Sequence, residues 1–224
     1  GEILSGWRLR NSNKPARIPE EHSETAFMTN RAMEFIEESK DKPWFLHLSY
    51  IKPHWPYMAP APYHNMYSAN EFYPVHRNDA ERNNDHPVYK AFMENSISKT
   101  FSKDEVRNTV LAGYMGLIKQ IDDNLGRLFK FLESSGHMDD TMIVFTSDHG
   151  DYQGDHWLGE KELFHEQSVR VPMIIYDPSD YANKTRGTKE ERFIEAIDLL
   201  PTFLDAVESP VSKHRLEGNS LIPL

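Results

Sequence analysis

The sequence predicts an α/β fold in which a mostly parallel sheet is covered by helices on both faces. Short apolar runs alternate with stretches of helical periodicity, as in folds whose strands are joined by helices. These runs are almost continuously apolar, which is typical of strands buried on both faces. A chain of 224 residues with 38% hydrophobic and 27% charged residues is also suited to a folded globular domain.

The first half of the chain is predicted to contain one helix, one strand and a long irregular segment. Apolar residues at helical spacing predict an amphipathic helix over 23–39. Pro43 ends that pattern, and the run 44–50 predicts a buried strand. The four prolines of 51–62 exclude regular structure there. Residues 63–101 are polar with weak periodicity, so we expect a peripheral excursion over the surface.

The clearest predicted element is a long helix that begins near Ser102. Ser102 and Glu105 have the spacing of a capping box, and Gly136 is a plausible stop. Between them the apolar residues recur every three or four positions and form one stripe. This stripe consists of Val106, Val110, Tyr114, Leu117, Ile121, Leu125, Leu128 and Leu132.

Two further strands and a last helix complete the predicted order. The runs 141–146 and 171–176 are apolar and predict strands, and a helix is expected from 198–201 to Val207. We expect the strands 44–50, 141–146 and 171–176 to share one sheet. The first two should have their carboxyl ends on the same edge, which is where ligands bind in open α/β sheets.

Composition and charge exclude several functional classes. The formal net charge is −10, so the chain as a whole should repel nucleic acid and anionic membranes. It has no cysteine, which excludes disulfides and thiolate metal ligands. No apolar run approaches the ~20 residues of a membrane span. Residues 1–6 lack the features of a signal peptide, which leaves the compartment open.

Polar clusters follow two of the predicted strands. Residues 52–57 follow the first of them, and Asp148 and His149 follow the strand 141–146, with Lys161 further on. Carboxylate and neutral imidazole are good ligands for a divalent cation. Each cluster alone is more often a solvated turn or loop packing, and a lone lysine is more often a surface residue. Their joint occurrence at two strand ends favours a site.

The segment 146–161, T-S-D-H-G-x4-D-H-x4-K, resembles the metal-binding segment of sulfatases and phosphonate monoester hydrolases in the alkaline phosphatase superfamily. Other stretches resemble the same family in the same order, so that the resemblance covers roughly 22–224. These stretches are 41–46, 53–57, 113–126, 166–172, 198–202 and 218–224. The resemblance implies an alkaline-phosphatase-like fold for the whole chain.

The resemblance also implies roles for individual residues. Asp148 and His149 would hold a divalent cation, with calcium, manganese or magnesium favoured. His54 would donate a hydrogen bond to the phosphoryl or sulfuryl group or to its leaving oxygen. Lys161 would place a positive charge opposite the anion, and two further histidines would contribute to substrate binding. These are His156 and His165, the latter at a position where relatives often have tyrosine.

One position separates the branches of the family. Typical sulfatases have Asp-Asn-Gly where this chain has Asp148-His149-Gly150. Asp-His, together with Pro53–Tyr57 and the following 59–64, is more similar to phosphonate monoester hydrolases and related phosphodiesterases. This favours phosphorus esters over sulfate esters.

The chain lacks the family's nucleophile. That group is a formylglycine made from Cys or Ser in Cys/Ser-x-Pro-Ser/Ala-Arg, or a Thr or Ser in other branches, whereas 13–17 offers only Asn at that position. Further metal carboxylates expected from the family's first strand are also missing. We therefore expect residues 1–224 to be the C-terminal portion of a hydrolase domain, inactive on its own.

Three functional hypotheses follow. The first is a metal-dependent hydrolase of phosphonate monoesters, phosphodiesters or sulfate esters. The second is a sulfatase acting on carbohydrate or aryl sulfates. The third is a non-catalytic homologue that binds anions or partners. Either enzyme would act on a small anionic ester, without nucleic acid or membrane as partner, and a homo-oligomer is compatible with the sequence.

Overall fold

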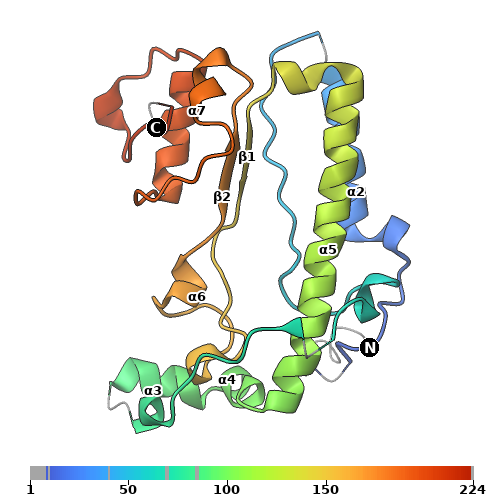
Figure 1. Ribbon diagram of the computed structural model, residues 1–224, viewed down its shortest axis with the longest axis vertical. Helices are drawn as coiled ribbons and strands as arrows, with labels where there is room; N and C mark the ends of the chain where they lie inside the picture. The colour runs from blue at the N-terminus through green and yellow to red at the C-terminus, as the bar shows by residue number, and fades with distance from the viewer. Residues whose placement is uncertain (1–8, 10, 40, 69–70, 84–85, 223–224) are drawn as a thin grey trace. The chain divides into compact units, whose positions relative to one another are not determined.

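The computed structural model describes residues 9, 11–39, 41–68, 71–83 and 86–222. The chain divides into two compact units, 1–174 and 175–224, and each is described by itself. Figure 1 gives the order of the elements.

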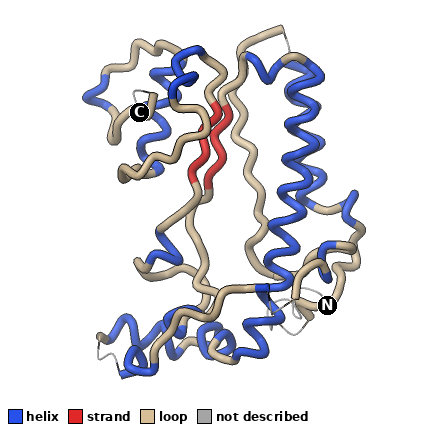
Figure 2. Tube along the Cα trace, viewed as in Figure 1, coloured by secondary structure: helices blue, strands red, loops and turns tan. Residues whose placement is uncertain are grey.

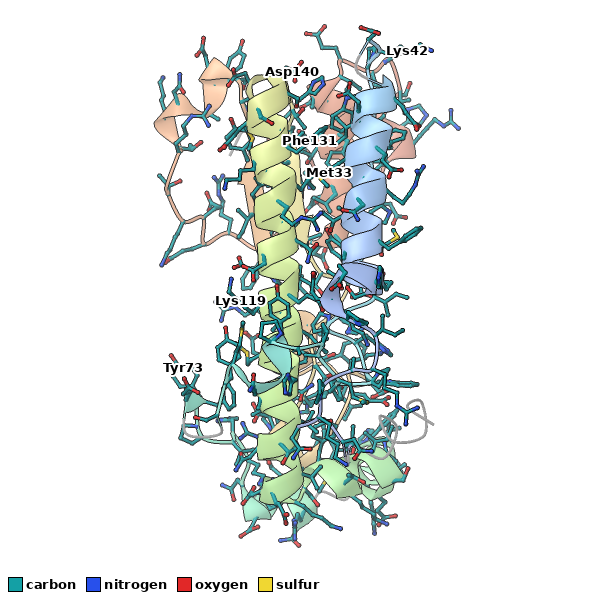
Figure 3. All side chains as sticks on the ribbon, turned by 90° about the vertical axis from the view of Figure 1, so that its right-hand side faces the viewer. Met33, Lys42, Tyr73, Lys119, Phe131 and Asp140 are labelled. Carbon is teal, nitrogen blue, oxygen red and sulfur yellow. The ribbon has the colours of Figure 1, made fainter. Side chains whose placement is uncertain are left out.

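Unit 1 is organised around two helices, α2 (Glu24–Ser39) and α5 (Asp104–Ser135), which lie side by side (Figure 3). Ala32 and Ile36 of α2 pack against Leu128 and Leu132 of α5 in one buried cluster. The helix predicted over 23–39 is therefore confirmed.

Polar side chains along one stripe of α5 add hydrogen bonds to this pairing. The Gln120 amide donates to Ser23 Oγ (2.7 Å), and Asn124 donates to Glu20 Oε1 (3.0 Å). Gln120 and Asn124 are both buried, so these bonds satisfy groups that would be costly to leave unpaired. Helix η1 (Glu20–His22) and α2 are thus fixed to the middle of α5.

The long helix expected to begin near Ser102 is confirmed, but the capping box is not. Helix α5 begins at Asp104 with Lys103 at its N-cap and no side-chain cap. The Ser102 hydroxyl instead donates to the Lys99 carbonyl (2.9 Å), because helix α4 (Ser96–Phe101) ends directly before it. The predicted end is confirmed, since Gly136 adopts the left-handed conformation (φ 79°).

The segment 44–50 is not a strand in the structure. Its burial alternates, with Trp44, Leu46 and Leu48 packed against the α2–α5 cluster and Phe45 68% exposed. It forms no ladder with another strand within the described residues, and Figure 2 draws it as a loop. The predicted sheet of three strands is therefore wrong for its first member.

The sheet of the described residues consists of β1 (Ile143–Thr146) and β2 (Met173–Tyr176). The Thr146 hydroxyl donates to the Pro172 carbonyl (2.9 Å), which places the end of β1 beside the start of β2. The two strands therefore run antiparallel. Both predicted strands are confirmed, but a mostly parallel sheet is not.

The excursion 63–101 contains short helices and carries both exposed and buried aromatic residues. Tyr73 is 92% exposed, whereas Tyr89 is buried in a small cluster with Tyr152 and Leu158. Its helices, in addition to α4, are η2 (Tyr63–Asn65), η4 (Asp79–Asn83) and α3 (Pro87–Glu94). Unit 1 also contains η5 (His137–Asp139), η6 (Asp155–Trp157) and α6 (Glu166–Val169).

Unit 2 is organised around α7 (Leu199–Ala206), which confirms the helix predicted near the end of the chain. The buried Thr202 hydroxyl donates to the Asp198 carbonyl (2.6 Å) and accepts the Leu221 amide (2.9 Å). The remaining turns are η7 (Asp180–Lys184), η8 (Ala196–Asp198) and η9 (Lys213–Arg215). None of the described helices is long and apolar enough to cross a bilayer.

Candidate functional site

The side chains of His54 and Lys161 meet although 107 residues separate them. Lys161 Nζ lies 3.3 Å from His54 Nε2. His54 Nδ1 lies 2.8 Å from the Trp55 carbonyl, which can only accept, so Nδ1 carries the proton of the neutral ring. The lone pair of Nε2 therefore accepts from Lys161. In this arrangement Lys161 carries the N–H groups, and the hydrogen bond that the resemblance expects His54 to donate to the ester stays a prediction.

A half-buried lysine organises the loop that carries His54. Lys52 Nζ donates to the carbonyls of Pro56 (3.0 Å) and His54 (3.2 Å). Burial lowers the pKa of Lys52, and the nearby Glu24 carboxylate opposes that shift. Lys52 thus ties the two ends of a proline-rich turn together. The sequence interpretation did not assign it a role.

A second contact joins the same loop to the segment after β1. The Tyr57 hydroxyl donates to Asp151 Oδ2 (2.8 Å), and the Gln153 amide donates to Asp151 Oδ1 (3.0 Å). Tyr57 is only 1% exposed, so the bond lies in the interior. Burial raises the pKa of Asp151, which these bonds and the nearby Lys161 counteract. The two polar clusters expected from the sequence therefore lie side by side.

Asp148 and His149 are brought together by the bend that follows β1. His149 Nδ1 lies 2.8 Å from the Gly150 carbonyl, so Nε2 keeps its lone pair. That nitrogen lies 3.5 Å from Asp148 Oδ2. Two ligands that each lie about 2.0–2.3 Å from one ion are roughly 2.8–3.8 Å apart. The two donor atoms therefore fit one divalent cation.

Gly150 is required here because the backbone of Gln167 and Ser168 lies very close to it. A positive φ is not the reason. Its amide donates to the Ser168 carbonyl (2.7 Å), and a Cβ at this position would lie 2.1 Å from the Gln167 carbonyl oxygen. The Ser168 hydroxyl in turn donates to the Lys161 carbonyl (2.5 Å). The backbone of Lys161 is thus tied to the segment next to His149.

The two donors of Asp148 and His149 do not complete a metal site by themselves. Within the residues that the structure describes, no group of three or more His, Cys, Asp or Glu side chains could hold an ion. Divalent cations take about four to eight ligands in proteins. Any further ligands must come from water, substrate or protein outside the described residues.

His156 and His165 contact other protein groups. Their rings stack at 4.2 Å with 18° between the planes. His156 Nδ1 lies 2.8 Å from Glu81 Oε1, and His165 Nδ1 lies 2.8 Å from the Tyr152 hydroxyl. Burial lowers the pKa of His165, and the neighbouring His156 lowers it further. The substrate-binding role expected for these two histidines remains a prediction.

A carboxyl group with a raised pKa precedes Lys161. Burial raises the pKa of Glu160 from its ordinary 4.5 to about 7, and the neighbouring Glu162 carboxyl adds to the shift. The Glu160 carbonyl accepts the Tyr152 amide (2.8 Å). The local sequence gives no signal for this shift, because it depends on burial.

Comparison with known proteins identifies a matching family model and several relatives of this chain. The family model described as Sulfatase matches residues 5–209. The multifunctional alkaline phosphatase superfamily protein PehA of Trinickia caryophylli is 40% identical over 95% of this chain and 43% of its own length. An arylsulfatase of Clostridium perfringens is 30% identical over 93% of this chain and 43% of its own length.

Solved structures of two phosphonate monoester hydrolases are also similar to this chain. The phosphonate monoester hydrolase of Agrobacterium radiobacter superposes with a TM-score of 0.85 at 30% identity, over 94% of this chain and 44% of that one. The phosphonate monoester hydrolase SpPMH of Silicibacter pomeroyi gives 0.80 at 33% identity, over 94% and 43%. The chain thus spans less than half the length of these relatives.

Proposed function

The chain belongs to the sulfatase family of the alkaline phosphatase superfamily, and from this premise we propose that it is the C-terminal portion of a metal-dependent ester hydrolase. Its substrates would be phosphonate monoesters, phosphodiesters or sulfate esters. The proposal rests on the contact between Lys161 and His54. This contact holds a positive charge at the position where the family resemblance expects one.

The chemistry of this chain begins with anion binding. The Lys161 ammonium donates to a non-bridging oxygen of the ester and opposes the negative charge that grows in the transition state. His54 accepts one N–H of the same ammonium, which orients the remaining two. Lys52 and the Tyr57–Asp151 bond hold the His54 loop in register with the Lys161 segment.

Asp148 and His149 are the residues that would hold the divalent cation. When bound, such an ion polarises a non-bridging oxygen of the ester and neutralises developing charge. The convergence of Asp148 Oδ2 and His149 Nε2 supports this assignment. We expect the formylglycine nucleophile and the remaining ligands to be supplied by protein outside this chain.

Phosphorus esters are the favoured substrates. Asp148-His149-Gly150 replaces the Asp-Asn-Gly of typical sulfatases, and two solved relatives that match over most of this chain are phosphonate monoester hydrolases. A tetrahedral phosphonate monoester or phosphodiester anion carries one negative charge, as a sulfate monoester does. Both can therefore be held by one ammonium and one cation, and the preference is a matter of degree.

The test uses substrates that share one leaving group. The full-length enzyme is assayed with a p-nitrophenyl phosphonate monoester, bis-p-nitrophenyl phosphate and p-nitrophenyl sulfate. We expect the highest kcat/KM for the phosphonate or the phosphodiester. A higher value for the sulfate would instead establish a sulfatase. Turnover of none of the three by metal-loaded enzyme would favour a homologue that binds anions without chemistry.

A further inference from the structure

A part of the excursion holds the loop that leads to Lys161. Residues 76–83 and 86–89, called here the brace, contact Asp155, His156 and Trp157 through backbone and side chains. The His156 amide donates to the His76 carbonyl (2.8 Å), the His76 amide to Asp155 Oδ1 (2.9 Å), the Trp157 indole to the Asn78 carbonyl (2.8 Å), and the Tyr89 hydroxyl to the His156 carbonyl (3.0 Å).

Cation–π contacts add to the brace. The guanidinium carbons of Arg77 and Arg82 lie 4.2 Å and 3.6 Å from the centre of the Trp157 ring. Such contacts stabilise most when the ring and the cation are partly desolvated. The brace therefore fixes both the backbone of 155–157 and the side chain of Trp157.

The braced loop has a backbone that needs support. His156 (φ 53°), Trp157 (φ 62°) and Glu160 (φ 64°) are in the left-handed region, which is unfavourable for residues other than glycine. Such conformations persist where the surroundings hold them, and they concentrate at functional sites. The residue that follows Glu160 is Lys161, so the angles of this loop decide where the ammonium lies.

Glu81 makes the side-chain contact of the brace with His156. Its Oε1 lies 2.8 Å from His156 Nδ1, and its Oε2 accepts the Asn78 amide (3.0 Å). Burial alone would raise the pKa of Glu81, but the Asn78 amide and His156 outweigh it and lower the pKa. The carboxylate is thus ionised at neutral pH and accepts the Nδ1 proton of His156. The His156 side chain is only 13% exposed.

The contact continues from His156 to the base of the Lys161 loop. His156 stacks on His165, whose Nδ1 and amide both contact the Tyr152 hydroxyl (2.8 and 3.2 Å). Tyr152 is 1% exposed, and its amide donates to the Glu160 carbonyl. A displacement of His156 therefore reaches the residue before Lys161 by two routes, one along the backbone and one through Tyr152.

We propose that Glu81 is a positioning residue for the hydrolysis, which acts through His156 and the left-handed loop to hold the Lys161 ammonium against His54. The inference rests on the proposed function, because Lys161 is the group that it positions. It assigns part of the excursion 63–101 a role in the reaction, although none of its residues needs to touch the ester.

A double-mutant cycle in the full-length enzyme tests this. Since Lys161 acts mainly on the charge that grows in the transition state, Glu81→Ala should lower kcat about tenfold, with a smaller rise in KM from weaker binding of the anion. In a Lys161→Ala background the same replacement should change kcat less than twofold, because the group that it positions is gone. Glu81→Gln should lose less activity than Glu81→Ala, since its amide oxygen can still accept from His156 although its NH2 group can no longer accept the Asn78 backbone amide. Asp79→Asn, an exposed carboxylate of η4, is the matched control.

A second measurement follows the position of Lys161 without turnover. Trace acetylation with acetic anhydride, read by mass spectrometry against the exposed Lys103, should label Lys161 several-fold faster in Glu81→Ala than in Asp79→Asn. Glu81→Gln keeps one of the two acceptors, so Lys161 should be labelled in it at a rate between those of Glu81→Ala and Asp79→Asn. If Glu81→Ala does not fold, labelling of Lys161 in Glu81→Gln that is no faster than in Asp79→Asn would overturn the inference.

Equal losses of kcat in both backgrounds, or unchanged labelling in Glu81→Ala, would overturn the inference. An enzyme that hydrolyses none of the test esters would overturn the proposed function, while the labelling result would still decide the role of Glu81.

Discussion

At the scale of single residues, the roles proposed for Asp148, His149 and Lys161 can be tested separately. In the complete enzyme, Asp148→Ala and His149→Ala should each abolish metal-dependent turnover, because each removes a donor atom from a pair that already lies 3.5 Å apart. Metal content measured by mass spectrometry should fall with the activity. A protein with both replacements that kept its metal and its rate would contradict the assignment.

Lys161→Ala should give a different result. The Lys161 ammonium donates to His54 and is no metal ligand, so metal content should be unchanged. The rate should fall by roughly two to three orders of magnitude, as for loss of one electrostatic stabiliser. Loss of metal in this variant would show that Lys161 supports the site structurally rather than electrostatically.

Glu160 should make stability depend on pH. Its pKa rises from 4.5 to about 7 on folding, so between these values the folded state binds more protons than the unfolded state. Its contribution is complete below about pH 4.5 and is lost as pH rises through 7. Glu160→Gln should therefore flatten this decline and stabilise the protein at pH 8, as measured by urea denaturation across pH. An unchanged slope would contradict the shift.

The local sequence pointed to candidate residues with distinctive chemistry but missed carboxylates whose partners are distant in the chain. His54, Lys161, Asp148 and His149 stand in short motifs, so their types and spacing could be recognised. Asp151 and Glu81 are ordinary carboxylates whose partners lie 94 and 75 residues away. Only the folded chain brings such partners together. The proton position on His54 likewise depends on a carbonyl contact that no pattern encodes.

At the scale of elements, one face of α5 approaches η2 through glycine. A Cβ at Gly116 would lie 2.3 Å from the Tyr63 carbonyl oxygen, whereas one at Gly126 would meet nothing within 4 Å. Gly116→Ala should destabilise the chain by about 1–3 kcal/mol or more, since backbone must move. Gly126→Ala should stabilise it by about 0.4–1 kcal/mol.

The free energy of unfolding from denaturant titration checks both glycine variants. They change the same residue type in the same helix, so helix propensity cancels between them. A similar change in the free energy of unfolding at both positions would show that η2 does not pack directly on the backbone of α5.

Elements were predictable where one chain segment decides them. The periodicity of α2, the stripe of α5 and the apolar runs of β1 and β2 suffice, because a helix or a run of apolar residues is a local pattern. The capping box predicted at Ser102 is wrong because α4 ends at Phe101 and its last turn takes the Ser102 hydroxyl. The segment 44–50 has the alternation of a strand, but pairing depends on a neighbour that sequence alone does not supply.

At the scale of the molecule, the segment 44–50 should behave like an unpaired strand at the edge of a sheet. The backbone amides of 46–50 donate no backbone hydrogen bond within the described part of the chain. The side chains of Leu46 and Leu48 nevertheless pack against the cluster between α2 and α5. In the isolated chain these amides should exchange hydrogen rapidly, while the interior of α5 stays protected. In the full-length enzyme we expect them to become protected. Protection equal to that of α5 in the isolated chain would contradict this.

The hydrogen bonds between α5 and the residues before α2 can form only after α5 has been synthesised. Gln120 bonds Ser23 and Asn124 bonds Glu20, across separations of 97 and 104 residues. A ribosome that adds about 5–20 residues per second needs roughly 5–20 s to cover that distance. During this time α5 is not available to cover the apolar face of α2. A nascent chain of this protein should therefore be a client of chaperones until Leu132 has emerged.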